Sequence, residues 1–199
     1  MSLLDIFLAR TDPHDASAEA RAYRGRPILS YEVESHAGRG EVRRYVPHLF
    51  AAVTVTGPQD EAFEKGFATL TDYVSGANAD EMVLPAVLPA SQILVGHLRG
   101  CDTVREWRIA LPMPLDRLAD GTAPAPEDPD VMLRRARFER IATWRLDPDE
   151  LADPSRAEGM LETWLKGQGL EPAGELRLLF HDDPLTPPDR RRTEIALPV

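Results

Sequence analysis

The spacing of hydrophobic residues changes along this chain, and that change constrains the fold more than any other sequence feature. In residues 49–56 the apolar side chains alternate with more polar ones, which is the period of two expected of a half-buried strand. Residues 59–75 instead carry apolar side chains at intervals of four, three and four residues, on one stripe of a helix: Phe63, Phe67, Leu70 and Val74. The sequence therefore predicts both strands and an amphipathic helix.

The same change of period occurs a second time. A second helix is expected at about residues 154–168, where Asp153 caps the amino end, Pro154 takes the first position and Leu161 and Leu165 lie on the core stripe. Short strands flank both helices, at 28–34, 41–45, 49–56, 82–88, 93–97, 104–111, 131–138, 140–146, 175–181 and 193–197. This order predicts an α+β fold of two duplicated halves, in which two amphipathic helices pack on antiparallel sheet.

Length and composition favour one domain. The chain has 199 residues and is 43% hydrophobic, enough for one well-buried core. We divide it into an amino-terminal arm or capping helix at 1–27 and a single domain at 28–199. The arm carries an apolar stretch that needs cover, so it packs either on the domain or on a second subunit and thereby forms an oligomer. Its apolar residues are Leu3, Leu4, Phe7 and Leu8.

Charge and cysteine content restrict the partners. The net charge of -10 argues against nucleic acid, because phosphate binding needs surplus basic residues. Cys101 is the single cysteine, which excludes an intramolecular disulfide and fits a reducing compartment. No apolar run approaches the roughly 20 residues that cross a bilayer, and no signal peptide is evident. We expect a cytoplasmic protein without membrane or nucleic-acid partners.

Several segments carry a further signal. They are GEVRRY at 40–45, AAVTV at 51–55, GF at 66–67, YVSGAN at 73–78, MVLPAV at 82–87, APAP at 123–126, FHDDPLTPP at 180–188 and RRTEI at 191–195. In this order they resemble the SOUL haem-binding protein family. The resemblance implies a distorted antiparallel barrel with two helices and two pseudo-symmetric halves, related to the GyrI-like effector-binding fold.

The resemblance also implies a ligand. Family members bind haem or another tetrapyrrole in an apolar groove along the first helix, without catalysis, so we expect a binding or carrier protein. Arg44 stands where a histidine is proposed to hold iron, and arginine cannot coordinate a metal. His48 is the nearest substitute and becomes the candidate iron ligand. Phe67 and Thr71 are the candidate contacts on the helix.

Two other functions stay open. A GyrI-like effector-binding or hydrolytic module would hold a small molecule in a cleft between the halves, lined by Tyr45, Trp107 and Trp144 with a buried carboxylate. An interaction protein would instead use the apolar arm. No nucleotide-binding or hydrolase motif is present, so we do not expect an enzyme.

The charged residues outside these motifs have plainer interpretations. His181 and the aspartates after it predict a turn rich in acceptors rather than a metal site, because adjacent strand residues point to opposite faces. The basic run at 190–192 precedes the last strand, and we expect it to pair with acidic neighbours.

Overall fold

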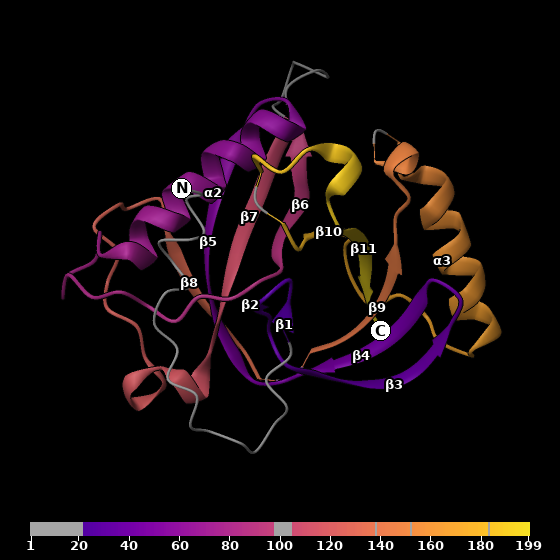
Figure 1. Cartoon of the computed structure of the whole chain (residues 1–199), viewed down its shortest axis with the longest axis horizontal. Helices are drawn as coiled ribbons and strands as arrows, with labels where there is room; N and C mark the ends of the chain where they lie inside the picture. The colour runs from indigo at the N-terminus through magenta and orange to yellow at the C-terminus, as the bar shows by residue number, and fades with distance from the viewer. Residues whose placement is uncertain (1–21, 98–104, 138, 152, 183) are drawn as a thin grey trace.

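The structure is a computed structural model that describes residues 22–97, 105–137, 139–151, 153–182 and 184–199. Two α-helices and a nine-stranded antiparallel sheet make up most of this part (Figure 1). The helices are α2 (Gln59–Ser75) and α3 (Ser155–Gly167). The strands of the large sheet are β3 (Tyr31–Ala37), β4 (Gly40–Tyr45), β5 (His48–Thr56), β6 (Ala90–His97), β7 (Arg105–Pro114), β8 (Met132–Ala136), β9 (Glu139–Arg145), β10 (Arg177–Phe180) and β11 (Thr193–Pro198).

The sheet confirms the duplication. Its strand order is β3-β4-β9-β11-β10-β6-β7-β5-β8. The units β5–α2–β6–β7 and β9–α3–β10–β11 have the same sequence of elements and the same pairing, and they meet where β6 pairs with β10. The strand that precedes each unit joins the other one, since β4 pairs with β9 and β8 pairs with β5. Each half is thus completed by a strand that is adjacent in sequence to the opposite half.

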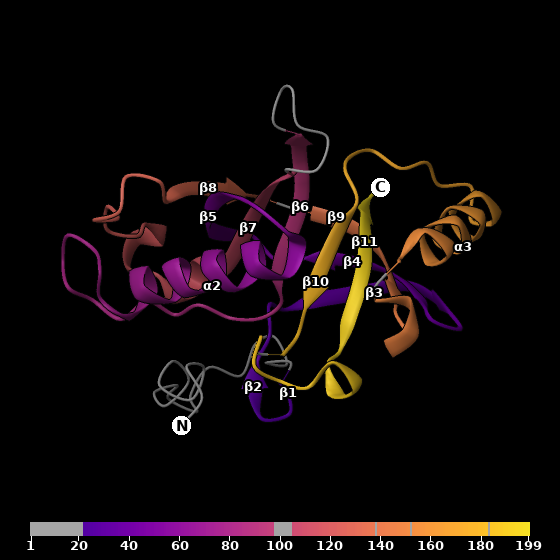
Figure 2. The ribbon, with the colours of Figure 1, turned by 90° about the horizontal axis from the view of Figure 1, so that it is seen from above.

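The large sheet is open and curved. β3 and β8 form its two edges in the described part of the chain, so the sheet does not close into a barrel. Figure 2 shows α2 and α3 at separate ends of the molecule, one over each half. The expected α+β fold with two helices is therefore confirmed, in its open form.

Helix α2 spans the residues that periodicity predicts. Asp60 and Glu61 lie in its first turn, where carboxylates stabilise free amides, and Gly76 ends it with a φ of 132°. Gly66 faces β7 so closely that a Cβ there would lie 2.8 Å from the Ile109 side chain. A glycine at this position lets the helix approach the sheet.

Helix α3 packs on the same face of the sheet. The N–H of Ser155 donates to Asp153 Oδ1 at 3.1 Å, as expected at the amino end of a helix. Trp164 of α3 packs on Trp144 of β9, with ring centres 6.5 Å apart, and on the backbone at Gly40 of β4. Both helices thus cover one face, and no α-helix of the described residues lies on the other face.

One predicted strand is wrong. Residues 82–88 form no strand, although Leu88 makes an isolated bridge with Ile28. Pro85 lacks a donor, and the nearby N–H groups of Leu84 and Val87 bond to separate elements instead of to one partner strand. The second part of the segment, from Leu84 to Leu88, packs its apolar side chains into the core without forming a ladder, whereas Met82 and Val83 are exposed.

The amino-terminal region is described only from residue 22. Residues 22–27 form a small hairpin of β1 (Ala22–Tyr23) and β2 (Arg26–Pro27). The apolar residues of the predicted arm, and Cys101, lie outside the described residues. In the described residues, no helix has the length and apolar character needed to span a membrane.

Candidate functional site

A pocket of about 140 Å³ lies on the helix-free face of the sheet, where the two halves meet. The alternation of β7 shows which face this is: Arg108, Ala110 and Pro112 line the pocket, whereas Ile109 packs under Gly66 of α2. Residues of β5, β6 and β7 from one half and of β9 and β10 from the other contribute to its walls. We call this the central pocket.

Apolar side chains form most of the walls. They are Leu29, Phe50, Pro89, Ile93, Ala110, Pro112, Ile141 and Leu179. A smaller polar group lines the same space: Tyr45, His48, Ser91, Arg108, Glu139 and Arg177. Apolar walls with a few convergent polar groups are typical of a small-molecule site.

His48 is held in one orientation. It begins β5, directly after Pro47, and is buried with 4% of its surface exposed. Its Nδ1–H donates to the Val46 carbonyl at 2.9 Å, which leaves Nε2 with a free lone pair. Burial lowers the pKa of His48, so the ring is neutral at pH 7. A neutral imidazole with Nδ1 bonded and Nε2 available is the form that ligates metals.

Glu139 lies close to both His48 and Arg177. Its Oε2 lies 3.8 Å from His48 Nε2, too far for a hydrogen bond, while its Oε1 forms an ion pair with Arg177. Because the guanidinium holds the carboxylate, His48 Nε2 keeps its lone pair for another partner.

A second charged group lies on the same face, beside the pocket. Glu194 is 1% exposed and accepts bonds from Arg43, His181 and Arg192, at distances from 2.6 to 3.1 Å. Burial alone would raise the pKa of Glu194, but the His181 and Arg43 bonds hold this pKa well below its usual value. We call these four residues the Glu194 cluster. It confirms the expected pairing of the basic run at 190–192 with an acidic neighbour.

The structure separates the residues predicted for the ligand. His48 lines the central pocket, but Phe67 is 2% exposed and packs under α2, on the opposite face of the sheet. Thr71 is also buried there and donates its hydroxyl to the Phe67 carbonyl at 2.7 Å. The three therefore do not form one site.

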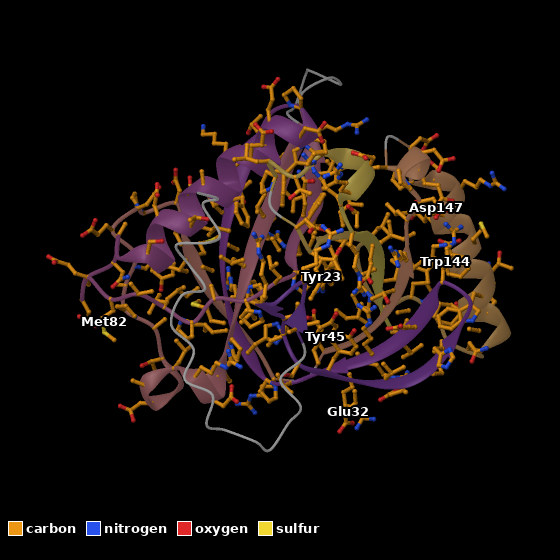
Figure 3. All side chains as sticks on the ribbon, viewed as in Figure 1. Tyr23, Glu32, Tyr45, Met82, Trp144 and Asp147 are labelled. Atoms are coloured by element: carbon orange, nitrogen blue, oxygen red, sulfur yellow. The ribbon has the colours of Figure 1, made fainter. Side chains whose placement is uncertain are left out.

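The cleft that we considered between the halves corresponds to the central pocket, although its predicted aromatic lining is only partly present. Tyr45 lines the pocket and lies in the middle of the molecule, whereas Trp144 lies beside α3 (Figure 3). Trp107 turns to the helix side, where its Nε1 donates to the Gly57 carbonyl at 3.1 Å. The buried carboxylate on Tyr45's face of the sheet is Glu194, and the half-buried Glu139 lines the pocket itself.

Sequence reasoning missed four of the polar pocket residues. Arg108 and Arg177 lie on strands that were predicted, at positions opposite the apolar stripe, whereas Ser91 and Glu139 lie just outside the predicted bounds of their strands. That alternation was a usable signal, but it also fits an arginine or glutamate that faces solvent. In the described residues, no three His, Cys, Asp or Glu side chains gather in a way that could hold a metal ion.

The sequence matches one protein family over most of its length. Residues 26–198 match the SOUL heme-binding protein family. The chain belongs to this family. No curated protein matches it closely enough in sequence to add to that assignment.

Solved structures with the same fold share little sequence with this SOUL-family chain. The EcmrR C-terminal domain is 11% identical, with a TM-score of 0.56, over 84% of this chain and 96% of that domain. A hydrolase from Listeria innocua is 15% identical, with a TM-score of 0.57, over 80% of this chain and 91% of that protein. These likenesses support the expected relation to the effector-binding fold.

Proposed function

We propose that this SOUL-family protein binds haem or another tetrapyrrole at the central pocket, with His48 as the ligand to the metal. The observation that carries the proposal is the state of His48: its Nδ1–H donates to the Val46 carbonyl, its neutral ring lines the central pocket, and its Nε2 accepts no hydrogen bond from any described residue. Bound haem would supply an iron that takes axial ligands and exchanges electrons.

The residues of the pocket fit part of such a ligand. Its volume of about 140 Å³ resembles that of cavities that admit a single benzene-sized ring, and is below the roughly 300–1,000 Å³ of sites that enclose a drug-sized ligand. One edge of a macrocycle would therefore enter between Ile93 and Leu179, and the remainder would lie across the rim.

Placement along α2 remains a prediction with less support. Phe67 and Thr71 point into the core, and a ligand would reach them only if the helix left the sheet. The outer side of α2 carries Glu61, Glu64 and Asp72, which repel the carboxylates of a tetrapyrrole. The central pocket offers cations instead.

A haemin titration followed by visible absorption tests the proposal. We expect the wild type to shift the Soret band at micromolar protein, and His48→Ala to lose that shift or weaken binding at least tenfold. His36→Ala is the matched control, because His36 is exposed on β3 and should bind haemin as the wild type does. An unchanged Soret position and affinity in His48→Ala would refute His48 as the ligand.

We further infer that the site binds its ligand without transforming it. A hydrolytic alternative has one observation in its favour, since the neutral His48 is a suitable general base. However, the group near its Nε2 is the Glu139 carboxylate, and Ser91 forms no hydrogen bond with His48 within the described residues. We expect p-nitrophenyl esters to be cleaved at equal, background rates by the wild type and His48→Gln. Cleavage that depends on His48 would favour the hydrolytic function.

A further inference from the structure

Two arginines face each other across the floor of the central pocket. The strand register aligns Arg177 of β10 with Ile93 of β6, and Ile93 with Arg108 of β7. All three side chains line the pocket. Because neighbouring strands are about 4.8 Å apart, the backbones at the two arginines are roughly 10 Å apart, with an apolar side chain between them.

These arginines are incompletely paired. Arg177 binds Glu139, but its Nε is buried and has no acceptor in the described part of the chain. Arg108 forms no ion pair or hydrogen bond through its side chain with any described residue, and its cross-strand neighbours, Ile93 and Thr54, carry no charge. A buried donor without an acceptor, such as Arg177 Nε, destabilises the protein, so such donors are rare unless a ligand or water completes them. Arg108 is half-buried, and its guanidinium lines the pocket without a partner from the described chain.

A hydroxyl lies beside the two cations. Ser91 is two residues before Ile93 on β6, on the same face, and its side chain also has no hydrogen-bond partner among the described residues. The pocket thus presents guanidinium and hydroxyl donors around apolar side chains, and Arg108 forms no ion pair with any described carboxylate.

We infer that Arg108, Arg177 and Ser91 form a carboxylate-binding subsite, which selects apolar ligands that carry a carboxylate. This inference rests on the proposed function, in which the carboxylate is a propionate of the tetrapyrrole. The planar fork of arginine matches a carboxylate in geometry, and a charge-assisted bond of this kind is stronger than a neutral one.

The test separates the carboxylate from the metal. Metal-free protoporphyrin IX and its dimethyl ester differ at the carboxylates and need no axial ligand, and their binding is measured by fluorescence. We expect Arg108→Gln to weaken protoporphyrin binding about tenfold. The ester should bind the wild type about tenfold more weakly than the acid, and Arg108→Gln should weaken ester binding no further, because the interacting pair is already lost.

Two variants control for general effects of charge. Arg105→Gln removes an exposed cation from the same strand, on the opposite face, and should bind protoporphyrin as the wild type does. Arg108→Lys keeps the charge without the fork and should weaken binding less than Arg108→Gln. Far-ultraviolet circular dichroism checks that each variant is folded.

The outcomes distinguish this inference from the proposed function. If the wild type binds the acid no more tightly than the ester, or if Arg108→Gln weakens both equally, the carboxylate subsite is wrong. The failure of His48→Ala to alter the haemin spectrum would instead refute metal ligation, and the dependence on Arg108 with metal-free protoporphyrin would still support the subsite.

Discussion

The Glu194 cluster and the central pocket lie on the same face of the sheet but differ in how fully their charges are paired. In the cluster, Arg43 and Arg192 both bind the Glu194 carboxylate, at distances down to 2.6 Å. In the pocket, Arg177 has one carboxylate and Arg108 has none among the described residues. The buried charges of the cluster are paired within the fold, whereas Arg108 is half-buried and lines the pocket without a counter-ion in the described chain, which is where a partner from outside the chain would bind.

Tyr45 joins the two regions. Its ring lines the pocket, and Arg43 Nη1 donates to its hydroxyl at 3.4 Å. Burial raises the pKa of the Tyr45 hydroxyl, so it stays neutral and adds no charge to either region. The contrast therefore rests on the arginines and carboxylates alone.

The largest expected effect comes from removing the carboxylate of the cluster. Glu194→Gln leaves Arg43 buried without its counter-ion, and we expect the free energy of unfolding to fall by about 3–5 kcal/mol. Urea denaturation measures this loss. Glu32→Gln is the control, because Glu32 is exposed on β3 (Figure 3) and the change should cost little. A loss below about 1 kcal/mol for Glu194→Gln would remove the distinction between the two regions.

A smaller effect is expected where the cluster meets the amino-terminal hairpin. Asp182 is buried and accepts bonds from Tyr23, from Arg24 and from the N–H of Arg192. Asp182→Ala should therefore cost about 1–3 kcal/mol and increase hydrogen exchange in residues 22–27. Asp189→Ala, at an exposed aspartate, is the control. Unchanged exchange in the hairpin would show that Asp182 does not hold it.

The next expected difference between the two regions is in how their contribution to stability depends on pH. Burial lowers the pKa of His48 below its ordinary 6.5, so the unfolded chain takes up the proton first. The contribution of His48 to stability is complete above pH 6.5 and is lost as the pH falls through the lower pKa of the folded state, by at most about 1.4 kcal/mol per pH unit. His48→Gln should flatten this part of the stability curve. A slope equal to that of the wild type would contradict a buried neutral His48.

Glu194 acts at lower pH, since its folded-state pKa is well below 4.5. Its contribution is complete above pH 4.5 and is lost as the pH falls further, so His48→Gln should leave this acid limb in place. The part of the slope below pH 6.5 that His48→Gln removes belongs to the pocket, and the part that remains belongs to the cluster, where burial also lowers the pKa of His181.

The smallest effect is expected for the unpaired cation of the pocket. Arg108→Gln breaks no ion pair in the described structure, so we expect its free energy of unfolding to stay within about 0.5 kcal/mol of the wild type. Thermal and urea denaturation without ligand measure this. A loss of about 2 kcal/mol or more, the size of a hydrogen bond to a charged group, would make Arg108 a structural residue like Arg43.

The sequence predicted the local structure of the helices better than the position of the site. The stripe of Phe63 and Phe67 defined α2 because a helix is set by neighbours three and four residues apart. The same stripe explains why Phe67 faces the core, a position that the family resemblance alone could not reveal. His48 lines the pocket because β5 begins at this residue, three positions after the first motif ends at Tyr45.

The remaining pocket residues depend on long-range pairing. Arg177 and Arg108 are far apart in the sequence. They line the same pocket only because β6 pairs with both β7 and β10. Local periodicity predicted both strands but not which strands pair with them. The error at residues 82–88 has a similar origin. A short apolar run that contains Pro85 resembles a strand in sequence, and only the partners of its N–H groups show that no ladder forms.

The exchange of β4 and β8 between the halves has a mechanical consequence. Opening the sheet between β6 and β10 would leave the ladders of β4 with β9 and of β8 with β5 intact, because each ladder lies on one side of that seam. The chain itself crosses the seam twice, in the short connections from β4 to β5 and from β8 to β9. These connections restrict how far the two sides can rotate apart, so the pocket floor is restrained by the chain as well as by the β6–β10 ladder. Selection among ligands falls to the side chains that project from this floor, and a change of ligand would need new side chains rather than a new conformation.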